Sequence, residues 1–547
     1  MQQKLSLNLL PVEASDASAI KRSIAAFTGN PVQSVSGFHI LKHSIDARAR
    51  TIWVNLSLNA FINEPFQQRQ RRSFDFKDVH LSRRRTVIIG AGPAGLFAAL
   101  QLIEKGITPI ILERGKEVRA RRRDLAILNK EGIVNPDSNY CFGEGGAGTY
   151  SDGKLYTRSN KRGNIDRILN LFVHFGAAEN ILFEAHPHIG TNKLPDIITA
   201  IRKQITECGG IFHFEKKVTD IIIEKEEIIA VQTLDGELFT ADAFILATGH
   251  SARDIFELLH QKQIMIEAKP FALGVRIEHP QSLIDQIQYH CLIRDENLPP
   301  ASYSLVQQLN KRGVFSFCMC PGGIIAPASS ATGELVINGW SPSKRNNPFA
   351  NSGMVVQVEL SDAMAELKKN PSANRPSETT SAGSLILTER NPLLMMYFQQ
   401  MVEQKCFDAG GGKFVAPAQR MADFTNGKTS TTLPECSYLP GIQSTPLEEV
   451  LPPFIHQSLA EGFLEFGKRM TGRTGPSSFF TNEAIVLATE SRTSSPVRIP
   501  RNKETLAHPQ FKNLYPCGEG AGYAGGIVSA AMDGEKVALK IAEVMSS

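Results

Sequence analysis

The sequence of 547 residues predicts an α/β fold, in which an α/β domain contains an inserted α+β domain and follows a small α+β domain. Three observations lead to this prediction. A β-branched strand, Thr86 to Ile89, enters a glycine-rich turn and then a helix to about Lys105. The end of the chain, from Leu514, repeats the order of strand, glycine-rich turn and helix. The long segment between these two parts has a mixed pattern of weak helix and strand signals.

Composition excludes several classes of protein. The chain has 59 Lys and Arg against 55 Asp and Glu, and a net charge of +4 is too small to make the whole protein a nucleic-acid binder. The eight cysteines form no CxxC pair, which argues against a zinc site or a secreted disulfide framework and suits a reducing compartment. No apolar run reaches about 18 residues, and the N-terminus lacks a signal-peptide pattern. We therefore expect a cytoplasmic protein with no membrane partner and no metal.

Residues 1–62 are predicted to form a small separate α+β domain. Asp16 can cap a helix that runs to Phe27, and the strands Phe38 to His43 and Thr51 to Leu58 follow it. The pattern indicates a strand-helix-strand-strand module, but it does not indicate what the module does.

Residues 63–85 are a basic linker. They could form a patch for RNA or for an acidic partner, or they could be a solvated connector, which we favour because charge runs are usually solvated. The basic residues in question are Arg69, Arg71, Arg72, Lys77, Arg83, Arg84 and Arg85.

The turn Gly90-Ala-Gly92-Pro93-Ala94-Gly95 lies between an apolar strand and an amphipathic helix, which is the context that a dinucleotide-binding motif requires. Gly90 permits the tight turn, Gly92 lets the backbone approach a pyrophosphate, and Gly95 allows close packing of helix on strand. The N-terminus of the helix offers free N–H groups to the phosphates. Glu113 ends the next strand, Pro109 to Leu112, 18 residues after Gly95, and can accept both hydroxyl protons of an adenosine ribose.

The rest of this domain is predicted from shorter patterns. Leu194 to Cys208 reads as a helix, and a meander of three strands precedes the buried strand Ala243 to Ala247. The meander strands are Val218 to Ile223, Ile228 to Leu234 and Leu238 to Ala241, with a hairpin turn at Asp235-Gly236. We place the Rossmann-like domain at 86–264 and 490–547, and the inserted substrate or cap domain at 265–489. The Pro/Ser-rich stretch Pro371 to Gly383 is predicted to be a mobile loop.

Two further glycine-rich segments lack the context of a Rossmann turn. Gly143 to Gly148 follows no apolar strand and precedes no helix, so we expect a flexible loop that lies against a ligand. Gly518 to Gly522 has the same defect, although it does follow a short strand at Leu514 to Pro516.

The order of these motifs resembles the glutathione-reductase-like group of FAD-binding proteins. Further segments, among them Cys141 to Leu155 and Ser491 to Val497, are similar to the bacterial uncharacterised FAD-dependent dehydrogenases of the NAD(FAD)-utilising type. The resemblance implies non-covalent FAD, with the third motif along the ribityl chain and flavin ring and an acid at Glu519 on the ribityl or pyrophosphate. The cofactor-binding residues are then Gly90, Gly92, Pro93, Ala94, Gly95, Glu113, Arg114, Gly146, Val218, Ala247, Thr248, Gly249, Gly518, Glu519, Gly525, Gly526 and Ile527.

The expected function is a FAD-dependent oxidoreductase, a dehydrogenase that transfers hydride or electrons through flavin N5 to or from a small-molecule substrate. The sequence names neither the substrate nor the catalytic residues nor the oligomeric state. NAD(P)H is a candidate transient electron donor, although we find no second strand-GxGxxG-helix unit for it. The alternative is a flavoprotein that binds or modifies RNA through the basic N-terminal region, but we do not expect a nucleic-acid partner.

Other residue patterns allow a functional and a structural interpretation. Cys318-Met-Cys320 could be a redox pair, but we favour structural cysteines, because residues two apart form a disulfide only with strain. His186 and His188 could line the flavin cavity, although ordinary hydrogen-bonded histidines are favoured. Cys141 and Cys517 are expected near the flavin, one of Arg119, Arg121, Arg122 and Arg123 could reach a phosphate, and the candidates for binding an acidic substrate are Tyr150, Lys154, Tyr156 and Arg158.

Overall fold

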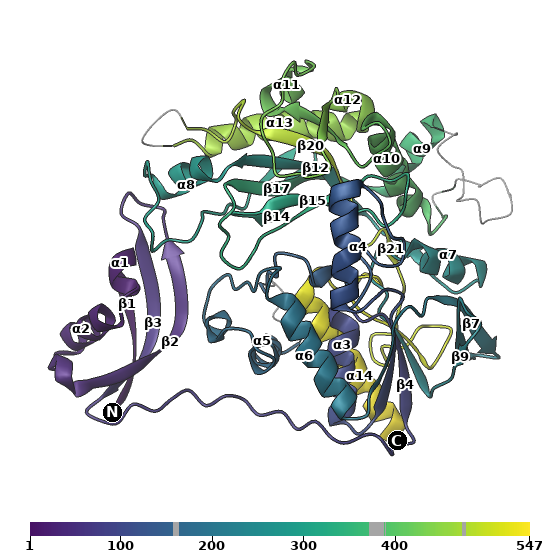
Figure 1. Ribbon diagram of the computed structural model, residues 1–547, viewed down its shortest axis with the longest axis horizontal. Coiled ribbons are helices and arrows are strands. Elements are labelled where there is room, and N and C mark those ends of the chain that lie inside the picture. The colour runs from purple at the N-terminus through teal and green to yellow at the C-terminus, as the bar shows by residue number, and fades with distance from the viewer. Residues whose placement is uncertain (157–162, 371–387, 389, 473–476, 547) are drawn as a thin grey trace.

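The computed structural model describes residues 1–156, 163–370, 388, 390–472 and 477–546. A small purple sheet lies to one side, and a long connector leads from it to a parallel sheet with helices (Figure 1). A large mixed sheet, formed by the middle of the chain, lies above both in the same view. The mobile loop predicted at 371–383 falls outside the described residues, as does Arg158.

The N-terminal unit is a three-stranded antiparallel sheet of order β1-β3-β2 with helices on one face. Asp16 accepts hydrogen bonds from the backbone N–H of Ser18 at 2.8 Å and of Ala19 at 3.1 Å, which confirms the predicted cap. Gly29 ends this helix in the left-handed region, with φ 67°. The elements are β1 (Gln2–Leu9), α1 (Pro11–Ala14), α2 (Ala17–Thr28), η1 (Val32–Ser34), β2 (Val35–Asp46) and β3 (Trp53–Ile62).

The predicted Rossmann-like part contains a five-stranded parallel sheet of order β22-β10-β4-β5-β6. Its strands are β4 (Arg85–Ile89), β5 (Thr108–Leu112), β6 (Ile211–His213), β10 (Ala243–Leu246) and β22 (Leu514–Pro516). The predicted meander is present as an antiparallel sheet of β7 (Val218–Glu224), β8 (Glu227–Thr233) and β9 (Leu238–Phe239). The first and last helices, α3 (Pro93–Glu104) and α14 (Ile527–Ser546), pack together so closely that a Cβ at Gly534 would lie 2.1 Å from the Ala94 carbonyl oxygen. The remaining helices here are α4 (Val118–Glu131), α5 (Ile165–His174), α6 (Leu194–Glu207) and α7 (Arg253–Gln261), with 3-10 turns η2 (Gly146–Gly148) and η3 (Glu179–Leu182).

The middle of the chain forms a seven-stranded sheet of order β13-β14-β17-β12-β20-β18-β19, in which only the β18-β19 pair is parallel. Its strands are β12 (Phe271–Pro280), β13 (Val306–Leu309), β14 (Arg312–Cys320), β17 (Phe349–Val358), β18 (Ala416–Arg420), β19 (Ile442–Ser444) and β20 (Ile485–Glu490). Two small pairs complete the strands: β15 (Ile324–Pro327) with β16 (Ile337–Trp340), and β11 (Glu267–Ala268) with β21 (Val497–Arg498). The helices are α8 (Gln281–Tyr289), α9 (Leu360–Lys369), α10 (Leu394–Ala409), α11 (Met421–Asn426), α12 (Leu447–Val450) and α13 (Pro453–Arg469).

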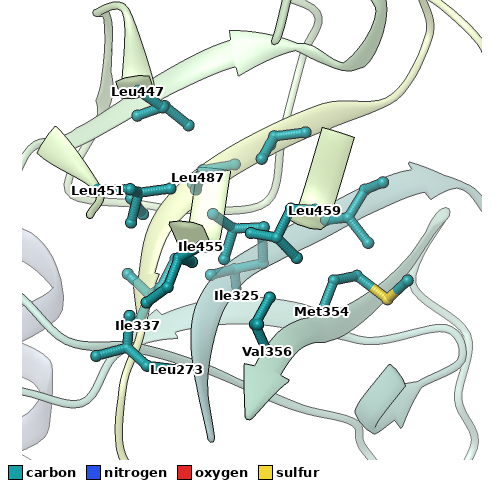
Figure 2. Close-up of a cluster of buried hydrophobic side chains, with 14 of the residues drawn as sticks. Leu273, Ile325, Ile337, Met354, Val356, Leu447, Leu451, Ile455, Leu459 and Leu487 are labelled. Carbon is teal, nitrogen blue, oxygen red and sulfur yellow. The ribbon is translucent and has the colours of Figure 1, made fainter. Parts of the chain in front are cut away.

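This sheet has its own core. Aliphatic side chains of the sheet pack against α12 and α13, as Figure 2 shows for Leu273, Val356, Leu451, Ile455 and Leu459. All of these side chains are at most 2% exposed, so the inserted unit has a hydrophobic core independent of the parallel sheet.

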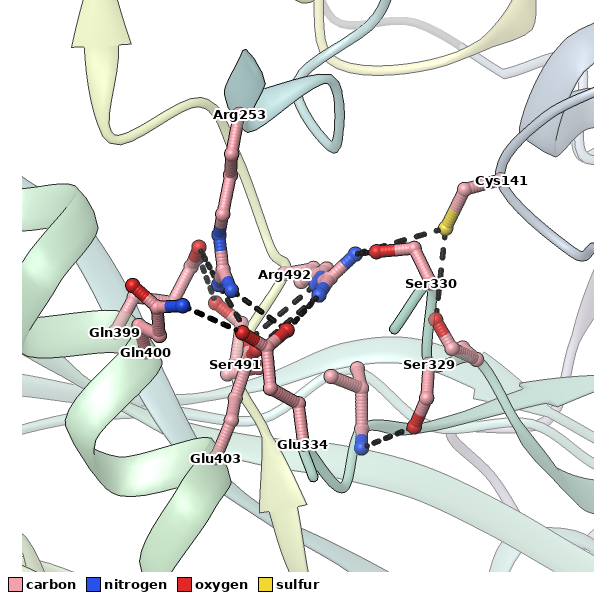
Figure 3. A network of polar contacts seen from close by, with 12 residues as sticks. Cys141, Arg253, Ser329, Ser330, Glu334, Gln399, Gln400, Glu403, Ser491 and Arg492 are labelled. Carbon is pink, nitrogen blue, oxygen red and sulfur yellow. Dashed lines mark hydrogen bonds and ion pairs between the residues drawn. The ribbon is translucent and has the colours of Figure 1, made fainter. Parts of the chain in front are cut away.

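A buried ion network joins the two larger parts of the molecule (Figure 3). Arg253 of α7 pairs with Glu334 and with Glu403 of α10, both at 2.8 Å. Arg492, just after β20, pairs with the same two carboxylates at 3.3 and 3.1 Å. The two arginines balance the two glutamates, so the contact between the parts is neutral as well as buried.

Candidate active site

A cavity of about 380 Å³ lies at the carboxyl end of the parallel sheet, where β4, β5 and β10 end, and faces the inserted unit. All but two of the predicted cofactor-binding residues line it: Gly90, Gly92, Pro93, Ala94, Glu113, Arg114, Gly146, Val218, Ala247, Thr248, Gly249, Glu519, Gly525, Gly526 and Ile527. The two exceptions are Gly95 and Gly518, which contribute to the packing and hydrogen bonding of the backbone behind the cavity. A Cβ at Gly95 would lie 2.0 Å from the Gly90 carbonyl oxygen, and the Gly518 N–H donates to Asp533 at 2.8 Å.

The turn after β4 has the conformation that its glycines predict. Gly90 has φ 108°, and a Cβ there would lie 2.5 Å from the Ala247 carbonyl oxygen, so neither the backbone nor the space accepts a side chain. Gly92 is the N-cap of α3 and has no side chain to satisfy the first N–H groups of that helix. These N–H groups and the positive end of the helix dipole are therefore free to bind an anion at the cavity wall.

Glu113 makes more hydrogen bonds to the surrounding backbone than the sequence indicates. Its buried carboxylate accepts hydrogen bonds from the backbone N–H of Ala91, Gly115 and Gly143, each at 2.9 Å. A carboxylate offers about four acceptor sites, so about one remains for a ligand. We therefore expect Glu113 to accept a hydrogen bond from one ribose hydroxyl rather than from both, because three backbone amides already occupy its other acceptor sites.

The loop from Gly143 to Gly148 is held firmly, so the prediction of a flexible loop is wrong. The guanidinium of Arg121 is fully buried and donates to the carbonyl oxygens of Glu144 and Gly146, both at 2.8 Å. It also donates to the carbonyl oxygens of Asn139 and Tyr140 and to the Thr149 hydroxyl. The loop lies against the first turn, since a Cβ at Gly146 would lie 3.0 Å from the Gly92 Cα. Arg119, Arg122 and Arg123 are exposed.

The third glycine segment brings an acid and a helix N-terminus to the cavity. Burial raises the pKa of Glu519 to about 7 and lowers the pKa of the neighbouring His250 to about 3. The His250 Nε2 lies 3.8 Å from the Glu519 Oε1, so a neutral imidazole faces a carboxyl that titrates near neutral pH. At Gly525 and Gly526, just before α14, an added Cβ would meet no atom within 4 Å, which leaves the backbone open to a ligand.

The segment after Gly148, the inserted unit and the residues just after β20 also line the cavity. These lining residues are Ser151, Asp152, Gly153, Lys154, Tyr156, Phe317, Cys318, Asn338, Arg492 and Thr493. Lys154 and Tyr156 were named from the sequence, whereas Asp152 and Asn338 were missed, because only the fold brings them near the glycine turns. Tyr150 instead points away and donates to the Val118 carbonyl oxygen at 2.9 Å.

Other predicted features lie elsewhere. His186 and His188 line a second, wider cavity of about 1160 Å³ between the N-terminal unit and the inserted unit. Cys141 lines the first cavity as expected, whereas Cys517 is buried and is not among the residues that line it. Within the described residues, no helix is long and apolar enough to span a membrane, and no group of side chains could hold a metal ion.

The basic linker makes ordinary surface contacts. Arg71 pairs with Glu179 at 2.9 Å and Arg72 with Asp166 at 3.5 Å. Arg69 donates to the Ile40 carbonyl oxygen at 2.6 Å. These contacts tie the linker to the protein itself and are consistent with a connector.

One relative covers almost the whole chain. An uncharacterized protein of Clostridium beijerinckii (strain ATCC 51743 / NCIMB 8052) is 37% identical over 546 residues, which is 96% of this chain and 96% of the relative. The chain belongs to the family of this clostridial protein. Family models add the cofactor: residues 83–127 match a FAD binding domain, and residues 270–493 match the family described as FAD-dependent protein, C-terminal domain-like. Residues 1–61 match a domain of unknown function. This family member is thus a FAD-binding flavoprotein of the oxidoreductase class.

Solved structures of flavoproteins are also similar, but distantly. The flavin-dependent brominase Bmp2 is 13% identical, with a TM-score of 0.35 over 84% of this chain and 79% of its own. A salicylate hydroxylase in a substrate complex is 13% identical, with a TM-score of 0.32 over 85% of this chain and 80% of its own. CtdE in complex with FAD is 9% identical, with a TM-score of 0.29 over 84% of each chain.

The cavity suits FAD on its own geometry. At Gly249, as at Gly525 and Gly526, an added Cβ would meet nothing within 4 Å, and at Gly92 it would meet only the Gly146 Cα at 3.9 Å. Side chains at these four positions would fill the space that a dinucleotide needs. The N-terminus of α3 would hold the pyrophosphate, and Glu113 has one acceptor site left for a ribose hydroxyl.

Proposed function

We propose that this flavoprotein is a dehydrogenase whose small-molecule substrate binds in the cavity, between the glycine turns and the inserted unit. The observation that supports this most is the composition of the cavity wall. Backbone and glycines make up one part of the wall, and the side chains of Lys154, Phe317, Asn338 and Thr493 make up another part. Bound FAD accepts or donates a hydride at flavin N5, whereas the protein supplies binding, orientation and electrostatics.

Within this proposal, residues 86–264 and 490–547 hold the cofactor, and residues 265–489 form a cap that defines the substrate. The neutral ion network of Arg253, Arg492, Glu334 and Glu403 supports a fixed cap, because separating the two parts would expose or strand four charges. The residues of the seven-stranded sheet would then exclude water from the reacting atoms.

Proton transfer in the cavity is assigned to Glu519. Its pKa of about 7 lets it hold a proton or release one near neutral pH, which is what a general acid or base requires. His250 cannot share this role, because burial and the positive charges of Arg492, Lys269 and Arg253 keep its imidazole neutral.

The finer parts of the resemblance belong to the same proposal. They are membership of the glutathione-reductase-like group, the NAD(FAD)-utilising dehydrogenase type, and NAD(P)H as a transient donor that enters the same cavity. A cytoplasmic location fits the eight cysteines, all of which are free. We propose no nucleic-acid partner, since the linker arginines Arg69, Arg71 and Arg72 already have partners within the chain.

The test is an anaerobic assay of flavin absorbance with the purified holoprotein. NADH and NADPH are added first, and fractionated metabolite pools follow as electron donors or acceptors. Loss of the oxidised flavin band with one donor, and its return with one acceptor, would support a dehydrogenase. If flavin is fully bound and is reduced only by dithionite across all pools, the protein is no dehydrogenase of a small metabolite.

A further inference from the structure

Two cysteines of the inserted unit lie at the flavin cavity in an irregular piece of strand. Cys318 and Cys320 end β14, and the pairing with β17 shifts register between Phe317 and Cys320. Cys318 has φ 48°, in the left-handed region that a non-glycine residue seldom adopts. The bulge places the two side chains next to each other, and the Cys320 thiol donates to the Cys318 carbonyl oxygen at 3.2 Å.

The two sulfurs have different access to the cavity. Cys318 lines it together with the glycine turns, whereas Cys320 is completely buried behind Cys318. A reactant in the cavity therefore reaches only Cys318, and Cys320 can react only with its neighbour. This is the division between an attacking and a resolving thiol that disulfide exchange requires.

Cations surround the pair. The Lys154 Nζ lies 3.8 Å from the Cys318 sulfur and 3.6 Å from the Cys320 sulfur, and the Arg276 Nη2 lies 3.7 Å from the Cys320 sulfur. Arg276 also donates to the Cys318 carbonyl oxygen at 2.8 Å, which fixes the bulge.

The carboxylates nearby do not cancel this positive charge. Glu490 pairs with Arg276, and Asp152 is shared between Lys154 at 3.2 Å and Arg345 at 3.0 Å. Lys154, Arg276 and Arg345 thus face Asp152 and Glu490, and the further carboxyl of Glu519 has its own cation in Lys269, so one positive charge is left for a thiolate to balance. Among the described residues, Glu519 also acts on Cys318, Tyr303 lies near Cys320, and His188 lies near Asp152 and Lys154.

The pKa directions agree with this count. The hydrogen bond from Cys320, followed by the charges of Lys154 and Arg276, lowers the pKa of Cys318 well below its usual value. In contrast, burial raises the pKa values of Cys406 and Cys517, which behave as ordinary core cysteines. Burial alone explains Cys406 and Cys517, whereas the structural interpretation that the sequence favoured for Cys318 and Cys320 explains neither the cations nor the bulge.

We propose that Cys318 and Cys320 are a redox-active dithiol that exchanges two electrons with FAD bound in this cavity. In the oxidising direction the S–H bond of Cys320 breaks and an S–S bond to the Cys318 thiolate forms. Two electrons and the released proton pass to oxidised FAD, so that charge and atoms balance. The reverse step cleaves the disulfide. A ring closed by residues two apart is strained, and a strained disulfide is easily reduced, which suits exchange rather than a permanent link.

The proposal rests on FAD occupying the cavity, and electron counting tests it. The holoprotein is oxidised with ferricyanide, freed of oxidant and titrated with dithionite under anaerobic conditions. Wild type should take up about four electrons per FAD, two for the flavin and two for the disulfide. The variants Cys318→Ser and Cys320→Ser should each take up about two, whereas the control Cys436→Ser, which lies outside the cavity lining, should match wild type.

Mass spectrometry supplies a readout independent of the flavin. After ferricyanide, the peptide that contains both cysteines should resist alkylation and weigh about 2 Da less than the reduced peptide. Uptake of only two electrons by wild type, with both cysteines alkylated after oxidation, would overturn the dithiol. Wild-type protein that lacks FAD, as judged by its absorbance, would instead overturn the cofactor site on which the proposal rests.

Discussion

Replacing Glu113 with Gln should weaken FAD binding and also destabilise the FAD-free protein. The ribose contact is a hydrogen bond to a charged acceptor, worth roughly 1.5 to 3 kcal/mol, so the Kd for FAD should rise about tenfold to hundredfold. The destabilisation follows from the three backbone N–H groups that donate hydrogen bonds to the Glu113 carboxylate at 2.9 Å. A Gln side chain turns one acceptor into a donor and leaves one buried N–H unsatisfied, at about 1 to 3 kcal/mol.

The assay measures both effects separately. Protein stripped of flavin is titrated with FAD to obtain Kd, and urea unfolding of the same stripped protein gives the free energy of unfolding. The matched control is Glu117→Gln, because this carboxylate lies close by in sequence, is 44% exposed and, within the part of the chain that the structure describes, pairs only with Arg202. If Glu113→Gln lowers the stability but binds FAD as tightly as wild type, Glu113 serves only the loop and contacts no ribose.

Three further predictions follow from the same geometry. Gly526→Asp should lower the flavin midpoint potential or block FAD binding, since a carboxylate before α14 opposes the partial positive charge of that helix. The control Gly526→Ala adds bulk without charge. Midpoint potentials equal to wild type in both variants would show that α14 does not face the flavin. Lys154→Gln should raise the pH at which iodoacetamide alkylates Cys318, because it removes a cation 3.8 Å from that sulfur, and an unchanged pH profile would contradict the role of Lys154. Burial raises the pKa of Glu519 from the usual 4.5 to about 7, so this group stabilises the FAD-free fold fully below about pH 4.5 and loses that contribution as the pH rises through 7. Glu519→Gln should therefore flatten the fall in the free energy of unfolding over this range. Equal slopes for wild type and variant in urea unfolding would refute the prediction.

The sequence by itself determined the features that depend on neighbouring residues. The turn from Gly90 to Gly95, the cap at Asp16 and the order of the meander strands all follow from spacings of a few residues, and the structure contains each of them. Local patterns of this kind survive because a tight turn or a helix N-terminus restricts the backbone wherever it occurs. The same patterns placed most of the predicted cofactor residues on one cavity.

Only the tertiary structure decided which distant side chains share that cavity. Lys154 is far in sequence from Cys318 and Cys320, yet it contacts both sulfurs, and no spacing rule relates them. Arg121 was one of four arginines of which the sequence predicts that one could reach a phosphate, but it is fully buried and fixes a loop that the sequence predicted to be flexible. The physical reason is the same in both cases. The charge that a buried group can hold depends on the partners around it, and these partners come from elements that meet only when the sheets pack together.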